Sequence, residues 1–378
     1  MTESDWTKLI RSTTKIDPLS GAINTPIQFS STFDQQDFDH FGEFDYARSG
    51  NPTRQVGEDA IASLEHGQHG FLFSTGMAAI SSVLLTFSQG DHLLVSKEVY
   101  GGTYRLLNEI LPRYGINHSY VDFANLSAIE KAIRKTTKAV YIETPSNPTL
   151  AISDIAAISR LAHKHNLIVI ADNTFMSPFL QNPLDLGADI VVHSATKFLA
   201  GHSDLTAGAV VTKDEKLADK IYFIQNAMGA TLGITDTWLL LRSIKTLGVR
   251  VQREATSAQK IAEWFEHGGW RVCYPGLKSH LGYEIHRSQA KSGGAVLSVD
   301  LGSEQTARQF VEKMTIPVFS VSLGGVETIV SYPPKMSHAE LSAEDLAADG
   351  ITPGLLRISV GLEDADDLIA DFSQALED

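Results

Sequence analysis

From about residue 69 onward, short apolar runs alternate with amphipathic stretches, and this alternation limits the possible folds more than any other feature of the chain. The runs have the length and apolar character of buried strands: 71–73, 92–95, 139–142, 167–171 and 190–192. The stretches between them have helical spacing: 76–88, 103–112, 126–135 and 153–165. Strands that alternate with helices form a parallel sheet covered on both faces, with the ligand site at the carboxyl ends of the strands. We therefore expect an α/β fold.

The rest of the chain predicts a second unit and an N-terminal arm. A chain of 378 residues exceeds the size at which a single hydrophobic core usually keeps growing. Residues 1–68 carry turn formers and scattered aromatic side chains, which favours an irregular arm that packs on a neighbouring subunit. Residues 235–265 have the pattern of one long helix, and strands are expected at 295–301, 317–321 and 355–360. The expected division is an arm (1–45), an α/β domain (46–240) and a smaller α+β C-terminal domain (241–378).

Charge and cysteine content exclude several classes of protein. With 45 acidic and 31 basic residues, the net charge of -14 repels a phosphate backbone, so no nucleic-acid partner is expected. No apolar run approaches the ~18 residues of a membrane span, and the first residues do not resemble a signal peptide. Cys273 is the only cysteine, so a disulfide within the chain and a cysteine-based metal site are both excluded. We expect a cytoplasmic protein that binds neither metal nor membrane.

Two polar side chains follow predicted strands at the edge where a ligand should bind. Asp172 ends one strand, and Lys197 follows the next strand in a segment of small and apolar residues. Asp172 alone could be a cap or a turn residue, and Lys197 alone could extend its amine to solvent. A lysine among apolar neighbours loses proton affinity, however, and its amine then becomes available for Schiff-base chemistry.

A third segment has the character of a phosphate cradle. Gly76 stands between a strand and a helix, where free backbone amides and the helix dipole favour an anion. Ser194 and Thr196 could add hydroxyl groups, although serine and threonine are also ordinary caps. Further groups could come from Tyr46 and Arg48, which could clamp the anion, and from Tyr100, which could stack on a ring. Lysine, carboxylate, cradle and aromatic ring together are the groups that pyridoxal 5'-phosphate requires.

Six ordered segments resemble the Cys/Met-metabolism family of pyridoxal-phosphate enzymes, which contains the cystathionine synthases and lyases. They are 46–53, 74–79, 141–148, 171–175, 194–198 and 322–327. The resemblance covers essentially the whole chain and implies the fold-type I PLP-dependent transferase fold, with a mostly parallel seven-stranded sheet flanked by helices. It also implies a homotetramer, built as a dimer of dimers, in which active sites are shared between subunits.

The resemblance assigns roles to particular residues. Lys197 would carry the cofactor covalently, Asp172 would pair with its pyridine nitrogen, and Tyr100 would stack on its ring. Its phosphate would be held by Gly76, Met77, Ser194 and Thr196, with Tyr46 and Arg48 reaching in from the neighbouring subunit. Arg357 would bind the substrate α-carboxylate with help from Asn147 and Ser322. Freed Lys197 would then take the Cα proton, and Tyr100 would handle a proton at the amine or the leaving sulfur.

Within the family, the amino-acid sequence of these segments is most similar to that of bacterial cystathionine β-lyases. Val321 replaces a glutamate that is usual in γ-synthases and γ-lyases, and Gly102 replaces a cysteine of methionine γ-lyases. The resemblance therefore implies β-elimination of cystathionine to homocysteine, pyruvate and ammonia, with Arg105 and Tyr104 at the distal end of the substrate. Cystathionine γ-lyase and an O-acetylhomoserine-dependent cystathionine γ-synthase or sulfhydrylase remain alternatives. A non-catalytic phosphate-binding α/β module is the alternative from another class, although no Gly-x-Gly-x-x-Gly fingerprint supports it.

Overall fold

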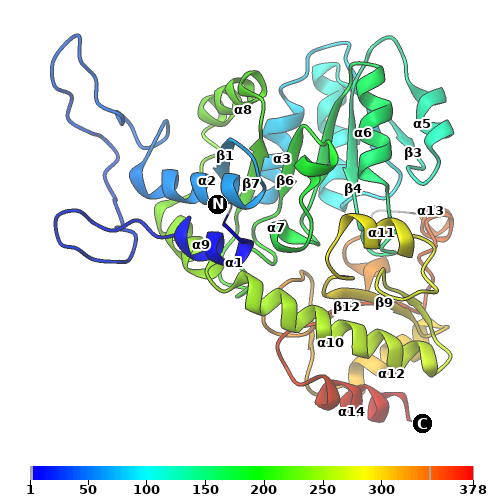
Figure 1. Cartoon of the computed structure of the whole chain (residues 1–378). Coiled ribbons are helices and arrows are strands. Elements are labelled where there is room, and N and C mark those ends of the chain that lie inside the picture. The colour runs from blue at the N-terminus through cyan, green and yellow to red at the C-terminus, as the bar shows by residue number, and fades with distance from the viewer. Residues whose placement is uncertain (1–2, 340–341, 378) are drawn as a thin grey trace.

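Two β-sheets organise the chain, and the long helix α10 (Leu247–His267) leads from the first to the second (Figure 1). The computed structural model describes residues 3–339 and 342–377. The large sheet contains β1 (His69–Phe73), β2 (His92–Ser96), β3 (Asn117–Val121), β4 (Thr137–Glu143), β5 (Ile168–Asp172), β6 (Ile190–His193) and β7 (Gly208–Thr212). The small sheet contains β8 (Arg271–Cys273), β9 (Val296–Asp300), β10 (Val318–Phe319), β11 (Ile329–Ser331) and β12 (Leu355–Ser359).

The large sheet is mostly parallel, as predicted. Its strand order is β1-β7-β6-β5-β4-β2-β3, and only β7 runs against its two neighbours. The small sheet has the order β10-β11-β12-β9-β8 and is mostly antiparallel. Sequence analysis missed β3, β7, β8 and β11. β3 is a partly exposed edge strand, so it lacks the apolar run by which buried strands were recognised.

Helices cover both faces of the large sheet, because alternate residues of its strands enter different cores. Ala139 and Tyr141 of β4 pack in the core that includes α3 (Gly76–Leu84) and α8 (Glu215–Met228). Val140 and Ile142 pack on the other face, in a core with α5 (Leu126–Ala132) and α6 (Ile155–Lys164). The small sheet packs on α10, α12 (Glu304–Lys313) and α14 (Ala365–Leu376). The predictions of a sheet covered by helices on both faces and of a smaller α+β unit are therefore confirmed.

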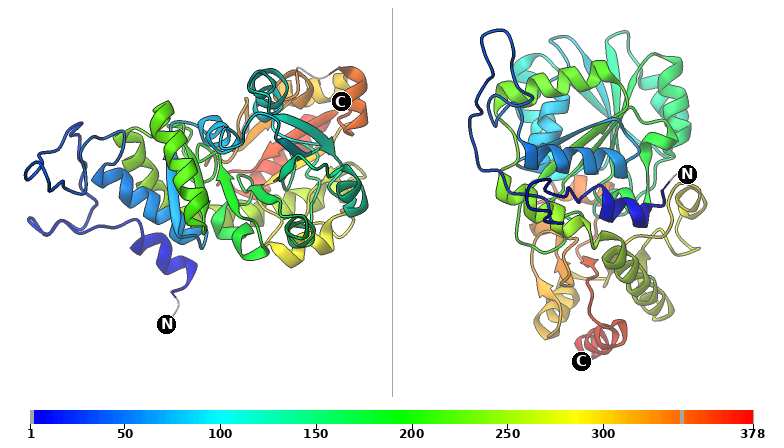
Figure 2. Two further views of the ribbon diagram at one scale, coloured as in Figure 1. Left: turned by 90° about the horizontal axis from the view of Figure 1, so that it is seen from above. Right: turned by 60° about the vertical axis from the view of Figure 1, so that its left-hand side comes forward.

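The N-terminal region is only partly irregular, which corrects the prediction for residues 1–68. It contains α1 (Asp5–Arg11) and the 13-residue helix α2 (Pro52–Leu64), which Asn51 caps by accepting hydrogen bonds from two backbone amides. The segment between these helices projects from the body of the molecule and exposes large apolar side chains, with Leu19 96% and Phe38 99% exposed (Figure 2). The turn formers before residue 52 hid the start of α2 from the sequence analysis.

The helix expected over 235–265 is instead two helices. α9 (Ile234–Ile244) ends before Lys245-Thr246, and α10 begins at Leu247. The helix expected at 103–112 is likewise divided: α4 (Gly101–Arg105) is followed by a π-helical turn (Leu106–Ile110) and a 3-10 turn (Leu111–Tyr114). The remaining helical elements are α7 (Ser177–Leu180), α11 (Tyr283–Gln289), α13 (Ala343–Ala348) and 3-10 turns at Pro183–Leu186 and Pro333–Lys335. None of the described helices combines the length and apolar character needed to cross a membrane.

Candidate active site

A cavity of about 460 Å³ lies at the carboxyl ends of the parallel strands, with residues of the small-sheet unit closing its other side. Eleven of the thirteen predicted site residues line it: Gly76, Met77, Tyr100, Arg105, Asn147, Asp172, Ser194, Thr196, Lys197, Ser322 and Arg357. Residues more than 280 positions apart in the chain therefore meet where the fold class predicts a ligand site.

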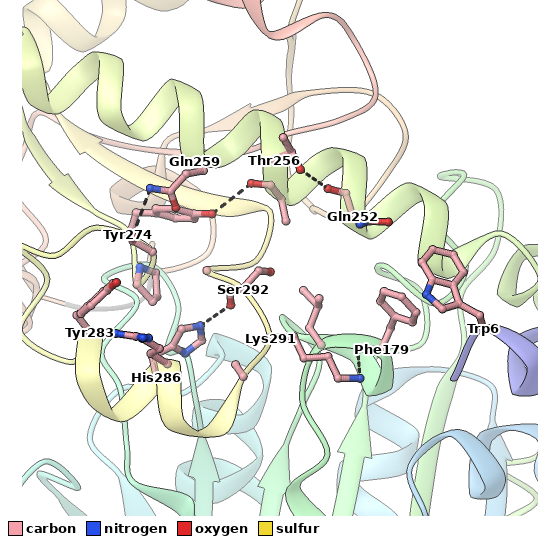
Figure 3. Close-up of a pocket in the computed structure, with 17 residues that line it drawn as sticks. Trp6, Phe179, Gln252, Thr256, Gln259, Tyr274, Tyr283, His286, Lys291 and Ser292 are labelled. Atoms are coloured by element: carbon pink, nitrogen blue, oxygen red, sulfur yellow. Dashed lines mark hydrogen bonds between the residues drawn. The ribbon is translucent and has the colours of Figure 1, made fainter. Parts of the chain in front are cut away.

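A second, larger cavity of about 610 Å³ lies among α1, α7, α10 and α11 (Figure 3). Trp6, Phe179 and Tyr274 form part of its wall. Its lysine is already engaged, because Lys291 Nζ donates to Asp5 Oδ2 at 2.6 Å and to the Phe179 carbonyl oxygen at 2.8 Å. None of the described residues that line this cavity is a carboxylate, so we take the smaller cavity as the candidate active site.

Lys197 stands in the turn that follows β6, with its amine directed into the site. Its Nζ donates to Ser322 Oγ at 2.6 Å. Burial, and then the positive charge of Arg357, lower the pKa of Lys197 to about 8. The amine is therefore substantially neutral in the pH range where an ordinary lysine is almost fully protonated, and a neutral amine is what nucleophilic and base chemistry require.

Asp172 ends β5 and is buried. Its Oδ1 accepts from the Thr174 backbone amide at 3.0 Å, and its Oδ2 accepts from the Tyr141 hydroxyl at 3.2 Å. Burial raises the pKa of Asp172, while the hydrogen bonds from Thr174 oppose the rise. A carboxylate held in this way is suited to pair with a cationic ring nitrogen.

The start of α3 meets the turn before Lys197 at very close range. Thr75 caps α3 by accepting from the Ala78 backbone amide at 2.9 Å. A Cβ atom at Gly76 would lie 2.7 Å from Ser194 Cβ, so only glycine fits without movement. Ser194 and the nearby Thr196 both line the cavity beside this helix start. Backbone amides, two hydroxyls and the α3 dipole thus fit the phosphate of pyridoxal phosphate.

Arg357 enters the cavity from β12 of the small sheet. Its Nη1 donates to Asn147 Oδ1 at 2.8 Å, and its Nη2 donates to the Ser322 carbonyl oxygen at 2.6 Å. Its buried Nε has no hydrogen-bond partner among the described residues. Burial lowers the pKa of Arg357 to about 10, so the guanidinium still carries its charge at neutral pH. A fixed, buried cation of this shape suits a carboxylate.

Tyr100 precedes α4, and its side chain is 43% exposed. A Cβ at Gly102 would come within 2.6 Å of the Tyr100 ring and 2.7 Å of Met77 Sδ. In this arrangement a cysteine at position 102 would displace one of the two side chains. Gly102 is therefore a packing requirement of Tyr100 as well as the residue that replaces the cysteine expected in methionine γ-lyases.

Sequence analysis missed Glu143, which lines the cavity at the end of β4. Its Oε2 accepts from the Tyr100 backbone amide at 2.8 Å. The rule that found Asp172, a carboxylate at the end of a buried strand, would also have found this residue. Tyr104, by contrast, lies outside the cavity lining and stacks on Tyr120 with ring centroids 5.7 Å apart, which corrects its expected place beside Arg105.

Tyr46 and Arg48 do not reach the cavity of their own chain. Arg48 Nη1 donates to Asn226 Oδ1 at 2.5 Å and to the Asn226 carbonyl oxygen at 2.7 Å. The Arg48 guanidinium also lies 5.4 Å from the centre of the Tyr46 ring. Both residues belong to the projecting N-terminal segment, so a role for them at an active site requires a second chain.

Comparisons with known proteins agree along the whole chain. The model of the family "Cys/Met metabolism PLP-dependent enzyme" matches residues 6–377. The chain is 51% identical over 383 residues to a cystathionine beta-lyase of Bacillus subtilis (strain 168), covering 100% of this chain and 98% of that protein. It is 46% identical over 373 residues to a cystathionine beta-lyase of Lactococcus lactis subsp. cremoris (strain MG1363), covering 98% of each.

A solved structure has nearly the same fold. The crystal structure of cystathionine gamma-lyase from Lactobacillus plantarum complexed with L-serine has a TM-score of 0.95 at 42% sequence identity, covering 99% of this chain and 98% of that one. The family match, the curated relatives and this structure all extend over almost the full length. The chain therefore belongs to the Cys/Met-metabolism family of pyridoxal-phosphate-dependent enzymes.

Proposed function

We propose that the chain is a cystathionine β-lyase, which cleaves the Cβ–S bond of cystathionine to give homocysteine, pyruvate and ammonia. The observation that carries this proposal is the match over the full length to a cystathionine beta-lyase at 51% identity. The cavity supports it, since a buried amine and a buried guanidinium meet there. Because the chain belongs to a family of enzymes, the alternative of a non-catalytic phosphate-binding module is disfavoured.

The cofactor is pyridoxal 5'-phosphate, which supplies an electron sink that stabilises negative charge at the substrate Cα when it is bound. We propose that Asp172 holds the ring nitrogen in its protonated form and that Lys197 is the residue of covalent attachment. The phosphate would be held by the start of α3 and the turn before Lys197: Gly76, Met77, Ser194 and Thr196. Tyr100 would cover one face of the ring.

Arg357 would orient the substrate by binding its α-carboxylate. Asn147 and the Ser322 carbonyl oxygen already fix the guanidinium, so little rotational freedom remains to be lost on binding. Lys197 Nζ would take the proton from Cα, since its lowered pKa makes the neutral amine available. Ser322 Oγ, 2.6 Å from Nζ, would keep this amine aimed at the reacting carbon.

Tyr100 would handle a proton at the departing sulfur, because its hydroxyl belongs to the side chain that covers the ring. Arg105, which also lines the cavity, would meet the distal end of the substrate. Val321 lines the same cavity and cannot bind a distal amino group as a carboxylate could. This difference favours β-elimination over γ-elimination.

We also propose a homotetramer, a dimer of dimers, in which Tyr46 and Arg48 complete the phosphate site of a neighbouring subunit. The exposed apolar side chains of the segment between α1 and α2 support this assembly, since a free monomer would leave them in water. The division into an arm (1–45), a cofactor domain (46–240) and a C-terminal domain (241–378), and a cytoplasmic location, belong to the same proposal.

Product analysis tests the reaction directly. Purified holoenzyme is incubated with cystathionine, and the keto acid and the thiol are identified. The proposal predicts equal amounts of pyruvate and homocysteine. The similarity to the cystathionine gamma-lyase of Lactobacillus plantarum makes γ-elimination the main alternative. A γ-lyase would release 2-oxobutyrate and cysteine, and those products would refute the proposal.

A further inference from the structure

Two carboxyl groups stand side by side in the active cavity, although only one of them has been given a role. β4 and β5 are neighbouring parallel strands, and Glu143 is paired in register with Asp172. Residues paired in this way project from the same face of a sheet, with strands about 4.8 Å apart. Both side chains are buried, and both line the cavity.

Two buried carboxyl groups at this separation resist being ionised together. Burial, and then the neighbouring Asp172, raise the pKa of Glu143 well above its usual value, while the Tyr100 backbone amide opposes the rise. The backbone amides of Tyr100 and Asn147 both oppose the rise in the pKa of Glu143. Asp172 receives hydrogen bonds from the Tyr141 hydroxyl and the Thr174 backbone amide, and the charge of His193 also opposes the rise that burial causes in its pKa, so its anion is better stabilised.

The other charged groups near Glu143 do not reverse this order. Glu98 faces it with a further carboxyl, which also raises its pKa. Tyr141 of β4 is buried and has its own pKa raised by burial. The cations of the cavity are Lys197, Arg357 and Arg105, and they line its wall with Glu143. Lys197 is bonded to Ser322, and Arg357 to Asn147 and Ser322.

We propose that Glu143 is a positioning residue that keeps its proton, leaves Asp172 as the single carboxylate of the pair, and fixes Tyr100 by accepting its backbone N–H. The inference rests on the cofactor site described above but not on which carbon–sulfur bond the enzyme cleaves. The backbone after Tyr100 consists of Gly101 and Gly102, and no side chain caps α4. The Glu143 bond is therefore the anchor at the start of this helix.

The protonated, neutral form of Glu143 also helps to keep the pKa of the Lys197 amine low. A second anion near Lys197 would favour its protonated form and so raise its pKa, against the low value that base chemistry needs. A neutral carboxyl can hold the Tyr100 amide without this penalty. Aspartate at position 143 would be too short to reach the same amide, and alanine would remove the acceptor.

Infrared spectroscopy of the holoenzyme tests the protonation state directly. A protonated carboxyl has a C=O stretch that ionised carboxylates lack and that shifts in heavy water. Near neutral pH we expect this band in the wild type and its partial loss in Glu143→Gln. Glu98→Gln is the matched control: Glu98 is a half-buried carboxyl that also has a raised pKa, but it lies outside the active cavity. A carboxyl spectrum unchanged by Glu143→Gln would overturn the proposal.

The pH titration of the visible band of the bound cofactor provides a second readout. Because glutamine is neutral, Glu143→Gln should move the apparent pKa of this band by less than about 0.3 units, whereas Asp172→Asn, which removes the partner of the ring nitrogen, should move it by about 1 unit or more. A downward shift of about 1 unit in Glu143→Gln would mean that Glu143 is ionised and would overturn the proposal.

The anchoring role is tested by comparing two variants that both remove the carboxyl. Glutamine keeps a carbonyl oxygen for the Tyr100 amide and alanine does not. Glu143→Gln should lose severalfold in kcat/KM and Glu143→Ala roughly tenfold more, about the value of one lost hydrogen bond. Circular dichroism and size-exclusion chromatography check that both variants fold. Equal losses would contradict the anchoring role, whichever product the enzyme releases.

Discussion

The two walls of the active cavity differ in how the chain builds them. The large-sheet wall comes from strand ends and the turns that follow them, where Gly76, Asp172 and Lys197 each belong to a short local segment. The small-sheet wall depends on contacts between distant segments, since Arg357 is held by Asn147, 210 positions away. Its other support is Ser322, which also accepts the hydrogen bond from Lys197.

This difference separates two tasks. The large-sheet wall carries the amine, the carboxylate and the proposed phosphate cradle, which suit a resident cofactor. The small-sheet wall carries a fixed guanidinium, which suits the α-carboxylate of an exchanging substrate. Substitutions on the first wall should therefore weaken retention of the cofactor, and substitutions on the second wall should spare it.

Removal of the amine should have the largest effect. Lys197→Ala should lower kcat by about 10⁴-fold, because both the covalent attachment and the base are lost. The visible band of covalently held cofactor should also disappear after dialysis, as absorbance spectra will report. Retention of that band in dialysed Lys197→Ala would mean that another residue holds the cofactor.

Removal of the guanidinium should have the next largest effect, confined to the substrate. Arg357→Ala should lower kcat/KM by about 10² to 10³-fold, the usual cost of truncating a buried, hydrogen-bonded charge partner. Cofactor content, measured by absorbance after dialysis, should stay close to that of the wild type. Arg357→Lys should recover little, since an ammonium cannot bind a carboxylate in the bidentate manner.

Adding a methyl group at Gly76 should weaken cofactor binding, which depends on the large-sheet wall, without affecting substrate binding. Gly76→Ala would place its Cβ 2.7 Å from Ser194 Cβ, so the helix start or the turn must move. We expect cofactor affinity to fall by about 10 to 100-fold, as equilibrium dialysis against pyridoxal phosphate will measure, while KM at saturating cofactor changes little. Gly233→Ala, at a glycine with φ -65° whose added Cβ would meet no atom closer than 3.5 Å, controls for substitution of a glycine by itself.

Ser322 contacts both Lys197 and Arg357, so it connects the two walls. Removing its hydroxyl should therefore lower activity less than removing either of those side chains. Ser322→Ala deletes the hydroxyl that accepts from Lys197 but leaves the carbonyl oxygen that accepts from Arg357. One lost hydrogen bond is worth about 1 kcal/mol, so kcat should fall by roughly five to tenfold with KM nearly unchanged. A change in KM larger than that in kcat would contradict the assignment of this hydroxyl to the amine.

The pH dependence of cofactor uptake should reveal the low pKa of Lys197. Attachment requires the neutral amine, so the rate at which apoenzyme takes up pyridoxal phosphate should rise about fivefold from pH 7 to pH 8 and level off above it, given a pKa of about 8. Because the positive charge of Arg357 lowers this pKa, Arg357→Leu should move the profile to higher pH. A rate that still rises severalfold between pH 9 and pH 10 would indicate an ordinary lysine.

The same contrast explains what could be predicted from the sequence. Parallel strands, Asp172, Lys197 and the cradle at Gly76 were predictable because each depends on a local pattern and on the rule that ligand sites lie at strand ends. Glu143 follows the same rule, since it comes directly after the apolar run 139–142, and it was overlooked although the pattern was present. The small-sheet wall required the family resemblance, since no local pattern brings Arg357 to Asn147. Helix α2 has a local start signal, Asn51 followed by Pro52, which the surrounding turn formers obscured. At the break between α9 and α10, Thr246 makes no side-chain cap of α10, so no local pattern marked the break.

The independence of the two walls is tested most directly by a double-mutant cycle. Cofactor dissociation constants and kcat/KM at saturating cofactor are measured for the wild type, Gly76→Ala, Arg357→Ala and the combined variant, at a pH of about 9, where the loss of the Arg357 charge changes the protonation of Lys197 least. We predict that the cofactor constant follows position 76 alone, that kcat/KM follows position 357, and that the two effects add within about 0.5 kcal/mol. A cofactor constant weakened as strongly by Arg357→Ala as by Gly76→Ala would contradict this division of the site.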